Sequence, residues 1–232
     1  MVSAGQQDAM FREQARRTEG IDTEVYARYN KDPLTPIIGR GDADLRVGLF
    51  GRDPGHNEIR HGTPFIGAGG QKLRQALYQH LHAQPMPDFA ASLAVGRHFF
   101  WANTVPYKPV GNKAWSMAVK KRFQPLMMAV LAEQWHGDAL ITLGREAFLW
   151  FGIGQSRDQR QRLEAFWRSD ARFEAGYPLT LGAPTGRARR VTLYPLPHPS
   201  PLNATWYKHF PAMLRARLQQ LHVRLDNLRV AE

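Results

Sequence analysis

Short apolar runs alternate with amphipathic stretches along most of the chain. The runs at residues 45–50, 98–102, 138–143 and 191–197 predict four strands. Because these runs are apolar nearly throughout, they are typical of strands that are buried on both faces. Helical patterns separate them, which favours parallel strands joined by crossover helices. We therefore expect an α/β fold, a three-layer α/β/α sandwich around a central, mainly parallel four-stranded sheet.

The stretches between these runs have helical periodicity. In residues 69–84, Leu73, Leu77 and Leu81 recur at four-residue spacing and would lie on one face of a helix. Pro211 either lies inside the last predicted helix or marks its true start. The other predicted helices span residues 115–135, 145–151, 157–173 and 204–224.

The first part of the chain is more polar than the rest. Residues 1–33 are helix-prone, and two X-Pro pairs at residues 32–36 end the segment, since the residue before a proline disfavours helical conformation. We expect residues 1–40 to form a helical arm that packs on a single domain spanning residues 1–232. The length of 232 residues lies within the single-domain range.

Composition narrows the functional classes. The chain has no cysteine, which excludes disulfides, thiolate nucleophiles, cysteine-ligated zinc and cysteine-ligated iron–sulfur clusters. Its nine histidines form no HxxxH or HxxEH pattern, so a histidine–carboxylate metal site is not expected. No stretch has the roughly 18 to 20 apolar residues of a membrane span, and the first residues do not resemble a secretion signal. We expect a cytoplasmic protein without membrane contact.

The net charge indicates a polyanionic partner. Lysine and arginine total 31 against 20 acidic residues, which gives a formal net charge of +11. Such a field attracts nucleic acid, because each phosphate contact releases counterions. The alternative is a basic surface that serves only solubility. Charge alone favours contact with nucleic acid.

Two stiff loops that follow predicted strands carry groups suited to catalysis. In residues 51–56, Gly-Arg-Asp-Pro-Gly-His, Asp53 could activate a water or stabilise positive charge on a sugar. In residues 198–202, His-Pro-Ser-Pro-Leu, His198 could hydrogen-bond an oxygen that becomes anionic. Alone, Asp53 fits a turn residue and His198 a loop cap. Both loops follow strands at the edge where parallel sheets bind ligands, which favours catalysis.

Other candidates are expected at the same edge. Phe65 could stack on a base, and the glycines that follow it could bring backbone amides to a phosphate at a helix N-terminus. Asn103 ends the second predicted strand and could pair with a base edge through its donor and acceptor atoms. A core phenylalanine and a strand-ending turn residue are the structural alternatives. The glycines concerned are Gly67, Gly69 and Gly70.

Basic and apolar loop residues complete the candidates. Lys108 and Lys113 lie in a loop suited to contacting a phosphate backbone. Leu202, on a rigid loop, could insert into a base stack or pack under the last helix. A basic cluster that could contact phosphates or simply be solvated consists of Arg187, Arg189 and Arg190.

Taken in order, these loops resemble the motifs of the uracil-DNA glycosylase superfamily. Residues 51–56 are closest to the GQDPYH motif of the main family 1 enzymes, and residues 198–202 are identical to their second motif. The middle is similar to the family 4 branch. Residues 62–70 resemble GxPFVGxAG, residues 103–112 resemble NVVKCRPPGN, and residues 143–147 resemble the strand end that reads alanine-leucine-glycine. The resemblance runs from about residue 45 to about residue 215.

The resemblance implies roles in excision of a flipped base. Asp53 would position the attacking water and stabilise the oxocarbenium-like sugar, and His198 would stabilise the departing uracil anion at its O2. Asn103 would bind the uracil edge, Phe65 would stack on the base, and Leu202 would fill the gap left in the duplex. Further substrate contacts would come from Gly51, Arg52, Gly55 and His56, and further DNA contacts from Gly67, Gly69, Gly70, Lys108, Lys113 and Ser200.

The chain also departs from the motifs that it resembles. The cysteines of the family 4 cluster are missing and Tyr107 stands at one of their positions, so we expect these loops to be held by packing alone, with no metal or diffusible cofactor. Gly55 replaces the tyrosine that blocks the thymine methyl in family 1. Family 4 also has glycine at this position. The rejection of 5-substituted uracils is therefore left open. The histidine insert of covalently trapping relatives is not evident after Asn103, so we expect release of free uracil.

Three functions compete on this sequence. The leading hypothesis is a monofunctional, monomeric uracil-DNA glycosylase that hydrolyses the N-glycosidic bond and leaves an abasic site for base excision repair. The second is the same scaffold acting on other deaminated or mismatched bases, such as hypoxanthine or thymine opposite guanine. The third is a module that binds damaged DNA without cutting it, which would need neither Asp53 nor His198.

Overall fold

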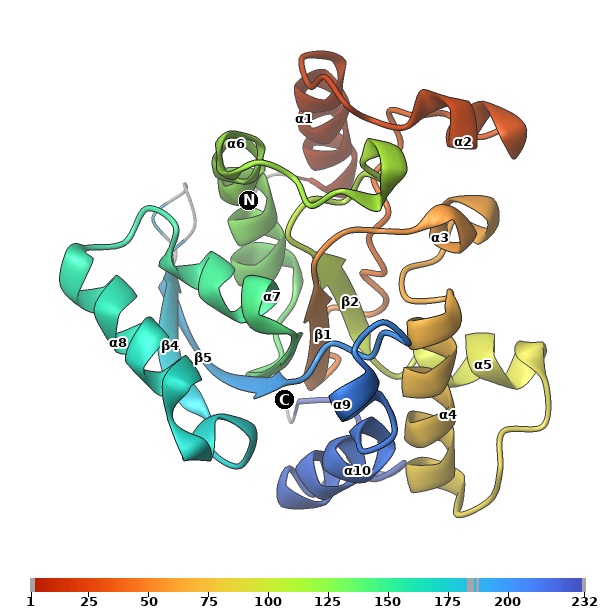
Figure 1. The fold of residues 1–232 in the computed structure, drawn as a ribbon, viewed down its shortest axis with the longest axis vertical. Coiled ribbons are helices and arrows are strands. Elements are labelled where there is room, and N and C mark those ends of the chain that lie inside the picture. Colours follow the sequence, from red (N-terminus) through yellow and green to blue (C-terminus); the bar gives the residue numbers. More distant parts are fainter. Residues whose placement is uncertain (1–2, 183–185, 187, 231–232) are drawn as a thin grey trace.

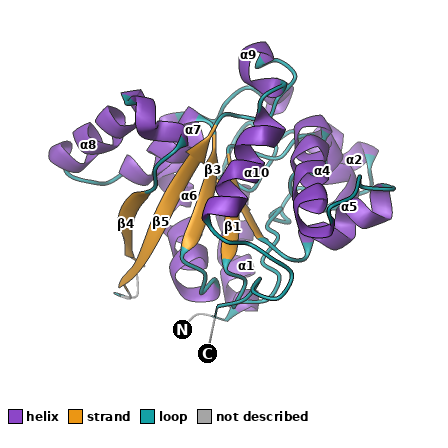
Figure 2. Cartoon of the chain, turned by 90° about the horizontal axis from the view of Figure 1, so that it is seen from below, coloured by secondary structure: helices purple, strands orange, loops and turns teal. Residues whose placement is uncertain are grey.

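A computed structural model describes residues 3–182, 186 and 188–230 and contains one five-stranded sheet. The strand order is β2-β1-β3-β5-β4, and all neighbouring strands are parallel except β4 and β5 (Figures 1 and 2). The predicted α/β class and its mainly parallel sheet are confirmed. The strands span β1 (Val47–Gly51), β2 (Phe100–Asn103), β3 (Ala139–Leu143), β4 (Tyr177–Gly182) and β5 (Ala188–Leu196).

The prediction of four strands was one short. The additional strand β4 forms the sheet edge and pairs antiparallel with β5. Its side chains alternate between half-buried and exposed over most of its length, so it lacks the continuous apolar run by which the other strands were recognised. An edge strand also tolerates Pro178, which lacks a backbone donor. Strand β2 begins two residues later than the predicted 98–102 run.

Helices cover both faces of the sheet and enclose two separate apolar cores (Figure 2). Inward residues alternate along β1, so that Phe50 belongs to one core and Leu49 to the other. The first core lies under α1 (Ala4–Arg16), α6 (Met117–Ala129), the π-helical turn η2 (Val130–Gln134), α7 (Arg145–Leu149), η3 (Trp150–Gly152) and α8 (Arg157–Arg168). The second lies under α4 (Ala68–His82), α5 (Phe89–Gly96) and α10 (Phe210–Gln220).

The remaining helical segments are short. The last predicted helix is split in two, and Pro211 lies in the first turn of α10, so it marks a start. None of the described helices combines the length and the hydrophobicity needed to cross a membrane. The short segments are α2 (Thr23–Arg28), α3 (His56–His61), α9 (Ala204–Tyr207) and the turns η1 (Val110–Asn112) and η4 (Asp170–Phe173).

The N-terminal helices pack on the domain. Phe11 of α1 is fully buried and stacks on Phe123 of α6, with ring centroids 6.4 Å apart. Further along, the Ile37 amide donates to the Pro106 carbonyl, and Gly39 pairs with Trp101 of the edge strand β2. These contacts tie the N-terminal segment to the outer side of the sheet (Figure 1).

Candidate active site at the carboxyl edge of the sheet

The loops predicted to carry chemistry meet at one edge of the sheet. Gly51 at the end of β1 is in register with Asn103 at the end of β2. At the end of β3, the Gly144 amide donates to the Leu196 carbonyl of β5, 2.8 Å away. The segments that follow these strands therefore start side by side, at the carboxyl ends where open parallel sheets bind ligands. They lead to Asp53 from β1 and to His198 from β5.

Asp53 is a buried carboxylate with one oxygen left over. Its side chain is only 3% exposed, and Oδ2 accepts from Arg52 Nε at 3.0 Å. Oδ1 is also buried and has no hydrogen-bond partner among the described residues. Burial raises the pKa of Asp53 to about 6, although Arg52 and Lys120 act against the rise, while Glu146 adds to it. Near neutral pH, Asp53 is a carboxylate able to accept a proton from a water at Oδ1.

His198 lies on a short, braced loop after β5. Its carbonyl accepts from the Ser200 amide at 2.9 Å and from Asn203 Nδ2 at 3.2 Å. His198 is exposed to solvent, but desolvation by the surrounding protein lowers its pKa, and the Arg52 cation acts in the same direction. At neutral pH, His198 is therefore a neutral imidazole that can donate an N–H to an oxygen becoming anionic.

Gly144 allows the His198 loop to approach β3. Its φ of +93° lies where side chains are disfavoured, and a Cβ placed on it would lie 3.1 Å from the Cβ of His198. The first turn of α7 begins immediately afterwards with Arg145 and Glu146. The close approach thus brings His198 next to α7 as well as to the strand ends.

An aromatic ring and a carboxamide meet above the end of β1. A Cβ on Gly51 would lie 2.4 Å from the Phe65 ring and 3.1 Å from Asn103 Oδ1, so only glycine leaves room for both. Phe65 is half-buried, has an unusual φ of +52° and lies 5.4 Å from the Trp101 ring. Asn103 is 2% exposed. A flat apolar surface beside a buried amide is suited to binding a planar, hydrogen-bonding ring.

Arg74 of α4 fixes the loop that carries Phe65, a role that was not predicted from the sequence. Its guanidinium is 1% exposed and donates to the carbonyls of Phe65 at 2.8 Å, Pro64 at 2.9 Å and Ser92 at 2.7 Å. It also lies 4.5 Å from the Trp101 ring centroid. An arginine on the inner face of an amphipathic helix was the available sequence signal, but its partners are set by tertiary contacts.

Glu58 of α3 joins the two loops of the site and was also missed. Its carboxylate accepts from the amides of Gly55 at 2.9 Å, Ile66 at 2.9 Å and Gly67 at 2.7 Å. Gly55 belongs to the Asp53 loop, whereas Ile66 and Gly67 follow Phe65. Because the Glu58 carboxylate accepts hydrogen bonds from backbone amides of both loops, it fixes the spacing between them strongly. The spacing of three residues between Gly55 and Glu58 matches a capping box and was the signal in the sequence.

Two glycines of α4 permit its first turn to touch both loops. A Cβ on Gly69 would lie 2.1 Å from the Pro199 carbonyl oxygen, and one on Gly70 would lie 2.1 Å from the Phe65 carbonyl oxygen. Neither approach tolerates a side chain. The Gly67 amide already donates to Glu58, so within this turn the predicted phosphate contact falls to the other backbone amides. The next amides lie in the first helical turn, where no intrahelical acceptor exists.

The family to which a chain with this site belongs follows from a comparison with models of protein families. The model of the uracil DNA glycosylase superfamily matches residues 38–222. The chain belongs to the uracil DNA glycosylase superfamily. Membership confirms the resemblance and indicates a DNA N-glycosylase, a hydrolase of base excision repair whose substrate is DNA. No curated protein matches the chain.

Lys108 does not have the role that superfamily resemblance implied. Its side chain is 4% exposed, its Nζ pairs with Asp22 Oδ2 at 2.7 Å, and it donates to the Pro109 carbonyl at 2.9 Å. A buried, paired ammonium is unavailable to a phosphate, so its prediction as a DNA contact is wrong. It holds α2 against the loop after β2 instead.

Other side chains that were predicted to contact the substrate or DNA are exposed, unlike that of Lys108. His56 and Lys113 are exposed, and Leu202 is 96% exposed on the loop after His198, where Ser200 Oγ accepts from its amide at 3.3 Å. These side chains are free to meet a large ligand. Of the basic cluster, Arg187 lies outside the described residues, whereas Arg189 and Arg190 begin β5, at the end of the sheet opposite His198.

The iron–sulfur cluster of the family 4 branch does not fit this member of the superfamily. The chain has no cysteine to bind it. At the position of one missing cysteine, the buried Tyr107 ring lies 5.5 Å from the Phe123 ring, and its hydroxyl donates to the Leu34 carbonyl at 3.0 Å. Aromatic packing therefore occupies this position and holds the loop after β2.

Proposed function

We propose that this protein is a monofunctional uracil-DNA glycosylase that releases uracil and leaves an abasic site. One observation carries the proposal. A buried carboxylate with an unpartnered oxygen, Asp53, and a neutral imidazole, His198, follow strand ends that share the edge beside Phe65 and Asn103. An aromatic surface, an amide, an anion and a neutral N–H donor are the groups that hydrolysis of a pyrimidine nucleoside needs.

The proposed reaction begins with a base outside the helix stack. Phe65 stacks on the flipped uracil, and the Asn103 carboxamide pairs with its edge. As the C1′–N1 bond breaks, its electron pair passes to uracil, and His198 donates a hydrogen bond to the developing O2 anion. Asp53 stabilises the positive sugar and accepts a proton from the water that adds to C1′. The products are uracil and a sugar with a C1′ hydroxyl.

Gly55 favours a second candidate, excision of thymine or other 5-substituted pyrimidines. The position carries no side chain that could meet a 5-methyl group, and Glu58 Oε2 lies 2.9 Å from where a Cβ would be. The same scaffold would then act on thymine opposite guanine, although uracil remains the smaller and better fitting base. Substrate competition decides between the two candidates.

The test incubates the protein with a labelled oligonucleotide that carries one uracil and then cleaves the strand at any abasic site with mild alkali. The uracil is presented in a single strand, opposite guanine and opposite adenine. Hypoxanthine and thymine oligonucleotides run beside it. We expect cleavage at uracil, and loss of at least about 100-fold in Asp53→Asn, since one positioned base contributes 10² or more. Asp226→Asn, at an exposed position, is the matched control. DNA binding without scission at any base would instead identify a binding module.

A further inference from the structure

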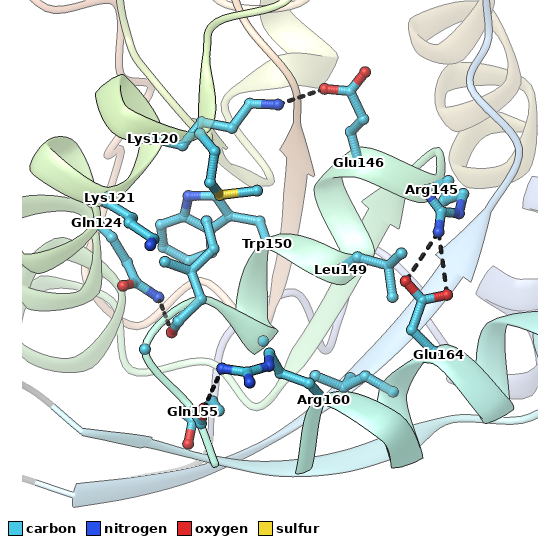
Figure 3. A pocket seen from close by; sticks show the side chains of 15 residues that line it. Lys120, Lys121, Gln124, Arg145, Glu146, Leu149, Trp150, Gln155, Arg160 and Glu164 are labelled. Carbon is cyan, nitrogen blue, oxygen red and sulfur yellow. Dashed lines mark hydrogen bonds and ion pairs between the residues drawn. The ribbon is translucent and has the colours of Figure 1, made fainter. Parts of the chain in front are cut away.

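A pocket of about 770 Å³ lies beside the site, between α6, α7 with η3, and α8 (Figure 3). The proposed reaction makes no use of it. Its walls combine apolar side chains with charged ones that come from three different helices, as Figure 3 shows. The volume is within the range of pockets that bind small organic groups.

One rim of this pocket adjoins the catalytic edge. Arg145 and Glu146 line it and directly follow Gly144, which approaches His198. Lys120 Nζ pairs with Glu146 Oε2 at 2.6 Å on the same rim. Glu146 is close enough to add to the rise in the pKa of Asp53 and to oppose the fall in the pKa of His198. A chain leaving the catalytic edge over α7 would therefore enter this pocket.

The pocket carries excess positive charge. Its acidic residues are already paired, Glu146 with Lys120 and Glu164 with Arg145 at 2.9 Å. Two cations remain, which is the number that a phosphodiester group can engage. Among the described residues, the exposed Lys121 has no acidic partner, and Arg160 donates only to the neutral Gln155 carbonyl at 2.9 Å.

An apolar surface lies within the same walls. Met117 is 54% exposed, and Leu149, Ile153 and Leu163 also line the pocket. Proteins bind single-stranded nucleic acid by placing cations on the phosphates and flat, usually aromatic, faces on the bases. In this pocket the side chains that could cover a base are the aliphatic Met117 and Leu149. A base paired within a duplex cannot turn its face into a pocket between helices.

We propose that this pocket binds an unpaired nucleotide of the same DNA strand, on one side of the uracil. Its phosphate contacts Lys121 and Arg160, and its base lies against Met117 and Leu149. This inference rests on the proposed function, because the catalytic edge fixes where the strand begins. It assigns a substrate class, which is DNA that is single-stranded or locally open on that side.

The experiment combines flank length with pocket variants. kcat/KM for excision is measured on single-stranded oligonucleotides in which either flank is cut to one nucleotide, and on partial duplexes in which either flank is paired. We expect the wild-type protein to lose about tenfold when one particular flank is shortened or paired. Lys121→Ala/Arg160→Ala should lose about tenfold on the long substrate and nothing further on the short one. The salt slope of binding should fall by about 0.7, because the pocket contacts one phosphate of the single strand.

The matched control is Arg97→Ala/Arg224→Ala, which removes two exposed cations from the opposite end of the sheet. Melting temperatures of both double variants show whether they fold. Equal activity of the wild-type protein on all flank lengths would overturn the inference. So would a pocket variant that loses as much activity on short as on long substrates.

A second measurement does not depend on excision. Oligonucleotides with 4-thiothymidine at each flanking position are crosslinked to the protein by light, and the labelled peptides are sequenced. Crosslinks to residues 117–124 or 145–164 from one flank support the pocket. Crosslinks confined to other peptides overturn it. If no oligonucleotide is cleaved, the proposed function fails and the crosslinks alone decide the pocket.

Discussion

At the residue scale, the catalytic groups are tuned by three neighbouring charges. Arg52 and Lys120 lower the pKa of Asp53, whereas Glu146 raises it. With the pKa of Asp53 raised to about 6, kcat/KM should fall as pH drops through about 6, because protonated Asp53 cannot accept a proton. Arg52→Gln should move this limb to higher pH and Glu146→Gln to lower pH. A pH–rate profile of each variant checks the prediction, and shifts in the same direction would contradict it.

The same pKa predicts that the catalytic carboxylate weakens the fold. Because burial raises the pKa of Asp53 from 3.8 to about 6, the folded protein binds this proton more tightly than the unfolded chain does. The stabilising contribution is fully present below pH 3.8 and is lost as pH rises through 6. Asp53→Asn should therefore stabilise the protein at pH 8 by about 2–3 kcal/mol and much less at pH 4. Urea unfolding at both pH values, with Asp226→Asn as control, measures this difference.

Glu58 and Gly55 form one structural unit, so a residue that the family 1 motif places at position 55 should not fit here. A Cβ on Gly55 would lie 2.9 Å from Glu58 Oε2. We expect Gly55→Tyr to displace the Glu58 carboxylate and reduce kcat/KM for uracil by about 10- to 100-fold, because both loops shift. Glu58→Gln should do the same while leaving the pH limb of Asp53 in place. Glu19→Gln, at an exposed site, is the control. Improved discrimination with full activity in Gly55→Tyr would refute this account.

At the element scale, the sequence predicted the strand ends better than the contacts that fix them. Asp53, Asn103 and His198 follow apolar runs, and parallel strands bring such positions to one edge whatever their order in the sheet. Strand β4 was missed because half of its side chains are exposed. Arg74 was missed because a buried guanidinium is identified only by carbonyls that tertiary structure brings to it. Lys108 was misassigned for the same reason.

Helix α1 has a packing role that can be measured. Phe11 is fully buried against Phe123, whereas its neighbour Met10 is 49% exposed. Phe11→Ala should reduce the free energy of unfolding by about 3–5 kcal/mol, because it removes a large buried ring and leaves a cavity. Met10→Ala should change it by no more than about 0.5 kcal/mol. Excision at temperatures well below the unfolding transition should be the same in both variants. A loss of activity without a loss of stability in Phe11→Ala would instead indicate that the helix contacts DNA.

At the scale of the whole molecule, two cores hold one sheet and leave its carboxyl edge for the reaction. A core on each face gives the strand ends fixed positions, so the loops that follow need only short anchors such as Glu58 and Arg74. The sheet therefore fixes the positions of the catalytic side chains, and the surface charge attracts the DNA. These two contributions respond differently to salt, since buried packing is screened far less than exposed charge.

The net charge of +11 cannot be removed by ion pairing, because each pair consumes one charge of either sign. The excess cations are therefore available to a polyanion. With about five phosphate contacts at ~0.7 each, kcat/KM on a single-stranded uracil oligonucleotide should fall on the order of 100-fold between 50 and 200 mM KCl. The melting temperature should change little over that range. An excision rate that salt leaves within threefold would mean that the basic surface serves solubility, and that the sheet edge alone binds the substrate.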